Sequence, residues 1–237
     1  MLYDVVICKT ELCPMLRSTI IVAGGSGKRM GAAMPKQFLL LKGRPVLCST
    51  IQAFRRADPA MPIVLVLPGD QIPVWGALCV NFQFDVPHQV VAGGEERFHS
   101  VRNGLACVAH DGLVSVHDGV RPLLSSDLIT RCFAAAEAHG AAIPVVPISS
   151  SVRELTTEGN EAIDRMRLRA VQTPQCFRTA LLRRAFELPY DPAFTDEATL
   201  VERLGVEVHL VDGEEQNIKL TTPFDLKVAE VVMGERP

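Results

Sequence analysis

Short continuous apolar runs alternate along the chain with longer stretches in which apolar residues recur every three or four positions. Continuous runs are typical of strands buried on both faces, and the wider spacing is typical of helices with one buried face. The predicted strands are Ile20–Ala23, Ile63–Leu67, Gln89–Ala92, Leu113–His117, Ala142–Val146 and Val206–Val211. The predicted helices are Val46–Ala57, Arg97–His110, Asp127–His139, Thr179–Glu187, Asp196–Leu204 and Pro223–Met233. This alternation predicts an α/β fold, with a mainly parallel twisted sheet and helices on both of its faces.

One polar segment, residues 148–172, breaks the alternation. Val152–Thr157 and Ala162–Gln172 read as two extended pieces around a turn at Glu158-Gly159-Asn160. A two-stranded ribbon is only marginally stable alone, so this protruding β-arm is expected to lie against a second copy of the chain in a homodimer. An exposed hairpin is the alternative.

The first predicted strand leads into a glycine turn followed by cations, an order that suits a polyphosphate. Glycine lets backbone N–H groups approach phosphate oxygens closely. The turn does not match a Walker A loop, because Gly24 and Gly27 are separated by two residues and Lys28 precedes Arg29. Nor does it match the dinucleotide fingerprint, because Met30 stands where the third glycine belongs. The pattern therefore favours a mononucleotide triphosphate.

Further candidate chemistry follows later strands and turns. Asp118 comes directly after a buried strand, where a single carboxylate can hold Mg²⁺ together with substrate phosphates; a simple ion pair with Arg121 is the alternative. His117 is interpreted as a packed strand-end residue. Lys219 is expected on a short strand, and Thr195 is expected to cap a helix. The turn Gly93-Gly94 could hold a nucleobase or ribose, or could simply begin a helix.

Composition excludes several classes of protein. The 237 residues carry a formal charge of −3 and only 5% aromatic residues, which argues against a nucleic-acid-binding surface. No apolar run reaches the length of a membrane-spanning helix. The seven cysteines form no Cys-x-x-Cys pair, so reduced thiols in a cytoplasmic protein are favoured. Residues 1–17 are interpreted as an N-terminal extension and residues 18–237 as a single domain.

The chain resembles the 2-C-methyl-D-erythritol 4-phosphate cytidylyltransferases of the non-mevalonate isoprenoid pathway over roughly Ser18–Met233. Seven short motifs carry the resemblance, in order and at matching separations. They are Ala23-Gly24-Gly25-Ser26-Gly27-Lys28-Arg29-Met30, Pro35-Lys36-Gln37, Gly93-Gly94-Glu95-Glu96-Arg97, Val116-His117-Asp118 with Arg121-Pro122, Thr173-Pro174-Gln175, Thr195-Asp196-Glu197 and Asn217-Ile218-Lys219.

The resemblance implies a Rossmann-like nucleotidyltransferase fold, CTP and a polyol phosphate as substrates, Mg²⁺ as cofactor, and a homodimer whose arms complete each other's sites. It implies Arg29, Lys36 and Lys219 as catalytic residues. Nucleotide-binding residues would be Ala23, Gly24, Gly25, Ser26, Gly27, Gly94, Glu95, Ser100, Asp118 and Gly119, with Asp118 also serving the metal. Acceptor-binding residues would be Arg121, Ser151, Thr173, Thr195 and, from the partner's arm, Arg165.

The chain departs from the family pattern at the arm, where Ser150 and Ser151 replace the usual aspartate and threonine, and at Gly119-Val120. These differences keep a second acceptor in view, a pentitol phosphate such as ribitol 5-phosphate. A third hypothesis for the function is a module that binds CTP without turnover. A sensor, however, has no reason to retain cations that act on a transition state.

Overall fold

The computed structural model describes residues 15–25 and 34–235. Eight strands of this part of the chain form one sheet in the order β10-β7-β11-β6-β1-β4-β5, with β12 also paired to β7. The strands are β1 Arg17–Val22, β4 Ile63–Leu67, β5 Gln89–Ala92, β6 Leu113–Asp118, β7 Ala141–Pro147, β10 Arg169–Val171, β11 Gln175–Arg178 and β12 His209–Asp212. β5, β4, β1 and β6 are parallel neighbours, and β12 is parallel to β7. Only β10 and β11 run antiparallel to their partners, which confirms the predicted mainly parallel sheet.

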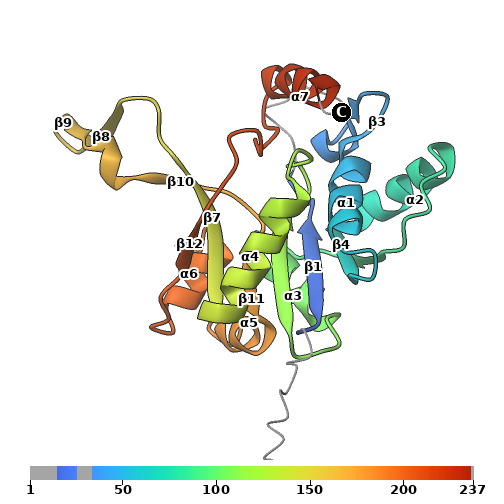
Figure 1. The fold of residues 1–237 in the computed structure, drawn as a ribbon, viewed down its shortest axis with the longest axis horizontal. Helices are drawn as coiled ribbons and strands as arrows, with labels where there is room; N and C mark the ends of the chain where they lie inside the picture. Colours follow the sequence, from blue (N-terminus) through green and yellow to red (C-terminus); the bar gives the residue numbers. More distant parts are fainter. Residues whose placement is uncertain (1–14, 26–33, 236–237) are drawn as a thin grey trace, which may run out of the picture.

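Helices cover both faces of the sheet, as predicted (Figure 1). They are α1 Val46–Ala57, α2 Ile72–Asn81, α3 Arg97–Ala106, α4 Ser126–His139, α5 Thr179–Ala185, α6 Glu197–Glu202 and α7 Pro223–Glu235. One core joins α1, α2 and α4 to the sheet through residues such as Ile21 and Leu65. The other core joins α3, α5 and α6 to the opposite face through Ile20 and Val66. Successive strand residues therefore enter opposite cores, which explains their continuous apolar character.

A glycine sets the distance between α3 and the sheet. A β-carbon at Gly104 would lie 2.7 Å from Cγ2 of Ile20 and 2.9 Å from Cγ2 of Val66. Because this position has no side chain, α3 packs directly on β1 and β4. The first residue of α3, Arg97, lies at the carboxyl end of these parallel strands.

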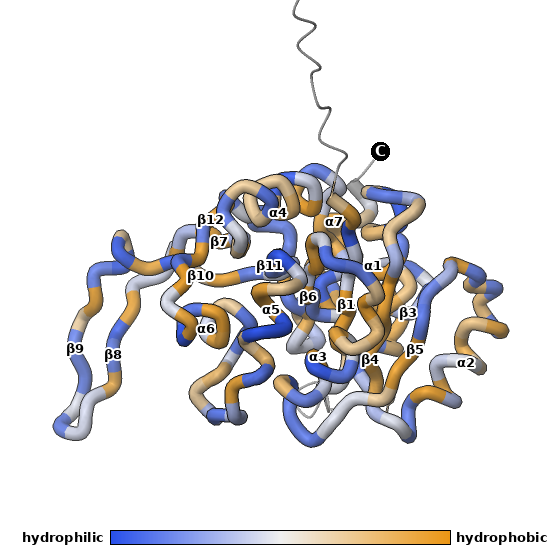
Figure 2. The backbone as a smooth tube through the Cα atoms, turned by 90° about the horizontal axis from the view of Figure 1, so that it is seen from below, coloured by the Kyte–Doolittle hydropathy of each residue, from blue (hydrophilic) through white to orange (hydrophobic). Residues whose placement is uncertain are grey.

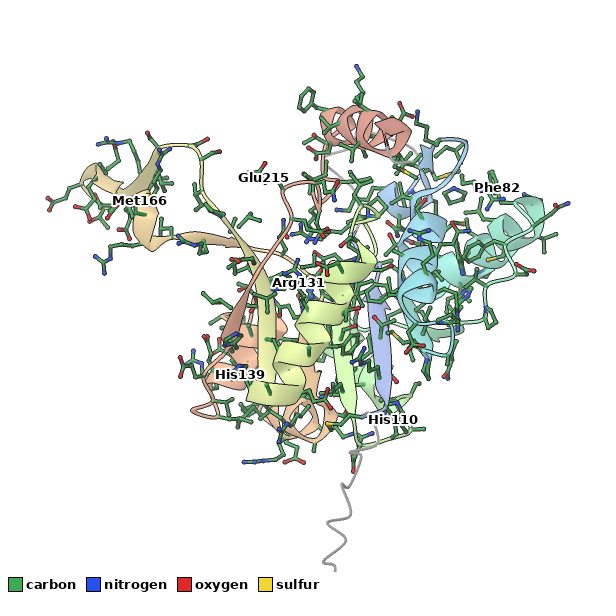
Figure 3. All side chains as sticks on the ribbon, in the orientation of Figure 1. Phe82, His110, Arg131, His139, Met166 and Glu215 are labelled. Carbon is green, nitrogen blue, oxygen red and sulfur yellow. The ribbon has the colours of Figure 1, made fainter. Side chains whose placement is uncertain are left out.

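The arm stands away from the body of the protein, as the tube in Figure 2 shows. It consists of β8 Val152–Thr156 and β9 Gly159–Ile163, followed by the 3₁₀ turn η4 Arg165–Arg167. The prediction of one extended piece over Ala162–Gln172 was wrong, because η4 separates β9 from β10. The turn also lies earlier than predicted, since Gly159 already belongs to β9. Leu155 and Met166 are 85% and 72% exposed, and Figure 3 shows Met166 on the arm, far from the sheet.

Several predicted boundaries shift. Four predicted elements are shorter than expected: α3 ends at Ala106, α5 ends at Ala185, α6 covers Glu197–Glu202 and β12 begins at His209. The pattern missed α2, β11, the short pair β2 Leu40–Leu41 and β3 Arg44–Pro45, and the 3₁₀ turns η2 Lys36–Phe38 and η3 Gly69–Gln71. The predicted extension over residues 1–17 lies outside the described residues up to residue 14, while Arg17 already pairs with β6. Among the helices of the described ranges, none has the length and apolar character needed to span a bilayer.

Candidate active site

The carboxyl ends of four adjacent parallel strands border a cavity of about 480 Å³. β1 leads into Gly24-Gly25, β4 into Pro68-Gly69, β5 into Gly93-Gly94, and β6 ends at Asp118. Ligands of open α/β sheets bind at this edge because the strand ends and the turns after them converge there. Nine residues that the sequence singled out line the cavity: Ala23, Gly24, Gly25, Lys36, Gly94, Glu95, Ser100, Asp118 and Lys219. Ser26, Gly27 and Arg29 lie outside the described residues.

Gly119 stands behind this lining and fixes the spacing of the strand ends. A β-carbon there would lie 2.7 Å from the β-carbon of Ala23. The N–H of Gly119 donates to the carbonyl oxygen of Val22 at 2.9 Å. The lack of a side chain at Gly119 therefore lets the ends of β1 and β6 meet under the cavity.

The turn Gly93-Gly94 is held against the start of α3. The N–H of Gly94 donates to Oγ of Ser100 at 3.1 Å, and a β-carbon on Gly94 would lie 2.4 Å from that of His99. Only glycine fits so close to the helix. Ser100 thus fixes the backbone of the turn and presents its hydroxyl oxygen to the cavity.

Lys36 reaches the cavity from η2, over the glycine turn after β1. A β-carbon on Gly25 would lie 3.4 Å from Cε of Lys36. The next residue, Gln37, is fully buried, and its Nε2 donates to the carbonyl oxygen of Ala23 at 2.8 Å and to Oε1 of Gln71 at 2.6 Å. Gln37 therefore ties η2 to the end of β1 and to η3. Sequence reasoning quoted its motif but assigned it no role.

Asp118 is surrounded by three cations. Its Oδ2 lies 2.8 Å from Nζ of Lys219 and 3.5 Å from Nε of Arg121, and its Oδ1 lies 3.8 Å from a terminal nitrogen of Arg97. Burial alone would raise the pKa of Asp118, but Lys219 and then Arg97 and Arg121 hold it well below its usual range. The carboxylate is therefore ionised at neutral pH. The predicted pairing with Arg121 exists, within a larger cluster.

His117, directly before Asp118, is fully buried and engaged at both ring nitrogens. Nε2 lies 3.1 Å from the carbonyl oxygen of Arg121, which can only accept, so Nε2 carries the proton. Nδ1 accepts from the hydroxyl of Thr173 at 2.9 Å, and that hydroxyl oxygen accepts from the N–H of Asp118 at 3.1 Å. Burial lowers the pKa of His117 to about 4, so the ring is neutral at neutral pH. It packs at the strand end, as the sequence suggested.

A second cavity of about 170 Å³ adjoins the first and shares three of its lining residues, Arg97, Asp118 and Lys219. Its other lining residues are Arg121, Val171, Gln172, Thr173, Gln175, Thr195 and Asp196. The predicted acceptor-binding residues Arg121, Thr173 and Thr195 are therefore gathered in one place. Arg121 and Thr173 are also linked through Asn217, which accepts from Arg121 at 2.7 Å and donates to Thr173 at 2.9 Å.

The other two predicted acceptor-binding residues, Ser151 and Arg165, lie on the arm. Both are exposed, neither lines a cavity described above, and the Arg165 guanidinium donates to the carbonyl oxygen of Ser149. The structure thus does not bring them to the site of their own chain. Figure 1 shows the arm extending sideways from the sheet.

Two local predictions near the site were wrong. Lys219 lies in an irregular segment and not on a strand, because the chain there crosses the end of the sheet without pairing to it. The cap of α6 is Asp196 and not Thr195, since Oδ1 of Asp196 accepts from the N–H of Thr199 at 2.9 Å.

Asp118 is the one carboxylate of the described ranges that both cavities share, and Mg²⁺ favours carboxylate oxygens as ligands. Within residues 15–25 and 34–235, no cluster of three His, Cys, Asp or Glu side chains could hold a metal by itself. Mg²⁺ does not require one, because it retains waters and takes ligands from substrate phosphates around one or two carboxylates. Asp118 lines both cavities, and among the described residues its Oδ1 has one ion pair, at 3.8 Å to Arg97. Asp118 therefore fits the role of a single carboxylate ligand.

A cation-rich double cavity at the carboxyl ends of a mainly parallel sheet, with glycine turns at its rim, defines the protein as an α/β nucleotidyltransferase. A profile of the 2-C-methyl-D-erythritol 4-phosphate cytidylyltransferase family matches residues 18–235, and the chain belongs to this family. It is 51% identical over 219 residues to the protein of that name from Bacteroides fragilis, covering 92% of this chain and 100% of the relative. It is 40% identical over 222 residues to the one from Geobacillus kaustophilus, covering 92% and 96%.

Solved structures agree. The crystal structure of the Thermus thermophilus 2-C-methyl-D-erythritol 4-phosphate cytidylyltransferase superposes with a TM-score of 0.75 at 34% identity, covering 92% of this chain and 98% of that one. The 4-diphosphocytidyl-2C-methyl-D-erythritol synthase of Anaerococcus prevotii superposes with a TM-score of 0.78 at 27% identity, covering 93% and 99%. The predicted family and Rossmann-like nucleotidyltransferase fold are confirmed.

Proposed function

We propose that the protein transfers CMP from CTP to 2-C-methyl-D-erythritol 4-phosphate, giving 4-diphosphocytidyl-2-C-methyl-D-erythritol and pyrophosphate. Family membership supports this reaction, and one observation of the structure carries it: two adjoining cavities share Arg97, Asp118 and Lys219. A transfer between two phosphate compounds needs two such sites with a common cationic boundary. Orienting both reactants at that boundary supplies much of the rate enhancement.

In this proposal CTP occupies the larger cavity. Gly94, Glu95 and Ser100, which line this cavity, would contact the cytosine, and Asp118, supported from behind by Gly119, would serve the ribose side. The triphosphate would follow the turn after β1, from Gly24 towards Gly27, where backbone N–H groups can bind phosphate oxygens. The acceptor phosphate occupies the smaller cavity, against Arg121, Thr173 and Thr195.

The reaction is an in-line displacement at the α-phosphorus of CTP. A phosphate oxygen of the acceptor forms a bond to this phosphorus, the bond from the phosphorus to the oxygen that bridges to the β-phosphate breaks, and pyrophosphate leaves with the electron pair. The acceptor phosphate is already ionised near neutral pH, so no general base is needed. This agrees with His117, whose ring nitrogens are both engaged within the protein.

The catalytic task is therefore neutralisation of charge. Lys36 lies over the glycine turn and, with Arg29, is proposed to stabilise the α-phosphate and the departing pyrophosphate. Lys219 is proposed to contact the α-phosphate from the boundary of the two cavities. Asp118 would hold Mg²⁺, the proposed cofactor, and the ion would supply further neutralisation of phosphate charge.

We also propose that the protein works as a cytoplasmic homodimer in which the arm completes the partner's site. The ribbon of β8 and β9 exposes Leu155, the turn η4 after it exposes Met166, and a two-stranded ribbon needs a surface to pack against. Ser151 and Arg165 lie on this arm and line neither of these cavities in their own chain. In a symmetric dimer each arm would carry these two residues to the acceptor cavity of the other copy.

Pyrophosphate release from CTP and Mg²⁺ tests the reaction when each acceptor is supplied separately. Release with methylerythritol phosphate and little with ribitol 5-phosphate is expected. Release with ribitol 5-phosphate alone would reassign the acceptor, and CTP binding without release under any condition would leave a nucleotide-binding module.

Mixing two inactive variants tests the shared site. If Arg165 acts in the partner's site, Lys36→Ala and Arg165→Ala homodimers should both be impaired. After subunit exchange, half of the dimers are mixed, and each has one site with both residues intact. Activity should therefore recover to about a quarter of the native value. Proven exchange without recovery would contradict the shared site, as would a fully active monomer in a mass measurement.

A further inference from the structure

Arg97 stands at the boundary of the two cavities, where one cation can act on both ligands. It begins α3, lines both cavities, and its side chain is 30% exposed. Arg97 closes the motif Gly93-Gly94-Glu95-Glu96-Arg97, and no role was predicted for it. What holds this guanidinium in place lies behind the cavities.

Glu197 is the residue behind it. Its carboxylate pairs directly with one terminal nitrogen of Arg97, its side chain is only 3% exposed, and it lines neither cavity. Its Oε2 is buried without a hydrogen-bond partner among the described residues. A buried carboxylate is costly unless it is paired, so its presence here requires an explanation beyond packing.

Gln175, on β11, contacts both neighbours of Glu197 in the sequence, Asp196 and Ala198. Nε2 of Gln175 donates to Oδ2 of Asp196 at 2.8 Å, and its Oε1 accepts from the N–H of Ala198 at 3.0 Å. The start of α6 is thus attached to the sheet. Glu197 presents its carboxylate to Arg97 from a rigid position.

Because of Glu197, the two terminal nitrogens of Arg97 face different carboxylates. One terminal nitrogen is held by Glu197, and the other stays 3.8 Å from Oδ1 of Asp118. Without Glu197, the guanidinium would be free to close on Asp118 as a bidentate pair, the preferred geometry for arginine and carboxylate. Such a pair would remove both the cation and the Oδ1 oxygen from the ligands.

We infer that Glu197 is a positioning residue for the transfer reaction, one that holds Arg97 at the boundary of the two cavities and keeps Oδ1 of Asp118 open to the nucleotide. The inference rests on the proposed function for its substrates. The effect of Glu197 on CTP binding through Arg97 can be measured without any turnover of substrate.

The decisive experiment compares Glu197→Gln, Arg97→Gln and the double variant. CTP affinity is measured by calorimetry with Mg²⁺ and no acceptor, and KM for both substrates is measured in the pyrophosphate assay. Glu197→Gln should weaken CTP binding and raise both KM values by about 10- to 100-fold, the usual cost of losing the partner that orients a ligating group. If Glu197 acts through Arg97, the double variant should bind CTP no worse than Arg97→Gln alone.

Glu202→Gln is the matched control, because Glu202 is an exposed residue of the same helix. It should leave affinity and both KM values unchanged. Glu197→Asp keeps the charge and should recover part of the affinity that Glu197→Gln loses. The double variant also guards against misfolding, because it removes the buried cation along with its counter-charge.

The inference is overturned if folded Glu197→Gln melts earlier but binds CTP and both substrates normally, or if the losses of the two single variants add in the double variant. A failure of the proposed function would look different. The native protein would then bind CTP without transferring CMP, while the affinities of the variants would still test the role of Glu197.

Discussion

Acidification should destabilise the protein through His117, the buried histidine directly before Asp118. The ring is buried, donates to a backbone carbonyl through Nε2 and accepts from Thr173 through Nδ1. A second proton would have to sit on Nδ1, where it would break the contact with Thr173. Burial, the main cause, therefore lowers the pKa of His117 to about 4 from an ordinary value of 6.5.

The sign and size follow from proton linkage. Above pH 6.5 the ring is neutral in both states and makes no pH-dependent contribution. Between pH 6.5 and 4 the unfolded chain binds a proton that the folded protein excludes, so the free energy of unfolding falls as pH falls. At pH 4.5 the accumulated loss is about 2.5 kcal/mol, from 1.36 kcal/mol per pKa unit. Asp118 stays ionised in this window because its pKa is lowered, and the stability that this lowered pKa contributes is lost only as pH falls below the ordinary value of 3.8.

The assay is urea unfolding at pH 7.0, 5.5 and 4.5 for the native protein, His117→Gln and His209→Gln. Glutamine can still donate to the carbonyl oxygen of Arg121 but cannot bind a proton. His117→Gln should be less stable at pH 7.0, since the contact with Thr173 is lost, yet its stability should fall by about 2.5 kcal/mol less on acidification. Groups that titrate elsewhere cancel in this difference.

His209→Gln, at an exposed position of β12, is the control for replacing a histidine elsewhere in the chain. Equal slopes for the native protein and His117→Gln would refute the reasoning. They would mean that the buried ring takes up its proton as easily in the folded as in the unfolded state.

Three further changes test the site and the packing beneath it. Lys36→Ala should lower turnover by roughly two to three orders of magnitude, as for loss of one oxyanion stabiliser. Lys227→Ala, at an exposed position of α7, should leave turnover unchanged. Near-normal turnover of Lys36→Ala would remove Lys36 from the mechanism. Lys219→Ala should raise the pKa of Asp118, observed as an upward shift in its carboxyl carbon titration by NMR, because its closest cation at 2.8 Å is lost. Gly104→Ala should cost about 1–3 kcal/mol in urea unfolding despite the better helix propensity of alanine, because its methyl group would overlap the sheet; a gain in stability would contradict this packing.

The elements that the sequence predicted best are those whose pattern reflects a local cause. α1 was predicted at both ends, because Val46–Ala57 has one face that enters the core and Asp58-Pro59 follows it. β4 was predicted in full, because all five residues of Ile63–Leu67 are buried between the two helical layers. In both cases the residues whose burial stabilises the element are also the apolar residues that make up its hydrophobic pattern.

The missed elements depend on distant partners. In α2, Ile72–Asn81, only Trp75 is fully buried and apolar residues occur on all sides, so no helical stripe is visible. β11, Gln175–Arg178, has four residues and is a strand because β6 and β7 border it. The second half of the arm reads as continuous strand, but β9 pairs with β8 and β10 pairs with β7, so the chain must turn between them at η4.

The candidate site divides in the same way. The rule that ligands bind at the carboxyl ends of parallel strands predicted the site at Gly24 and Asp118, the family resemblance added Gly94, and all three line one cavity. The same rule cannot supply the pairing of Arg97 with Glu197, which are 100 positions apart and meet only because β11 anchors α6 beside α3. The buried amide of Gln37 is likewise invisible in the sequence, because its partners come from two other turns.

In the proposed function one boundary serves two anionic ligands, and the charge arrangement would keep it ordered when they are absent. Three cations, Arg97, Arg121 and Lys219, surround two carboxylates, those of Asp118 and Glu197, so this cluster has a net charge of about +1. The carboxylates keep the cations from repelling one another and hold them in fixed directions. Incoming phosphates then meet donors that are already oriented, and little reorganisation is needed as charge moves to pyrophosphate. Removing a carboxylate from this cluster should therefore harm binding although it makes the site more positive, which separates a preorganised site from simple electrostatic attraction.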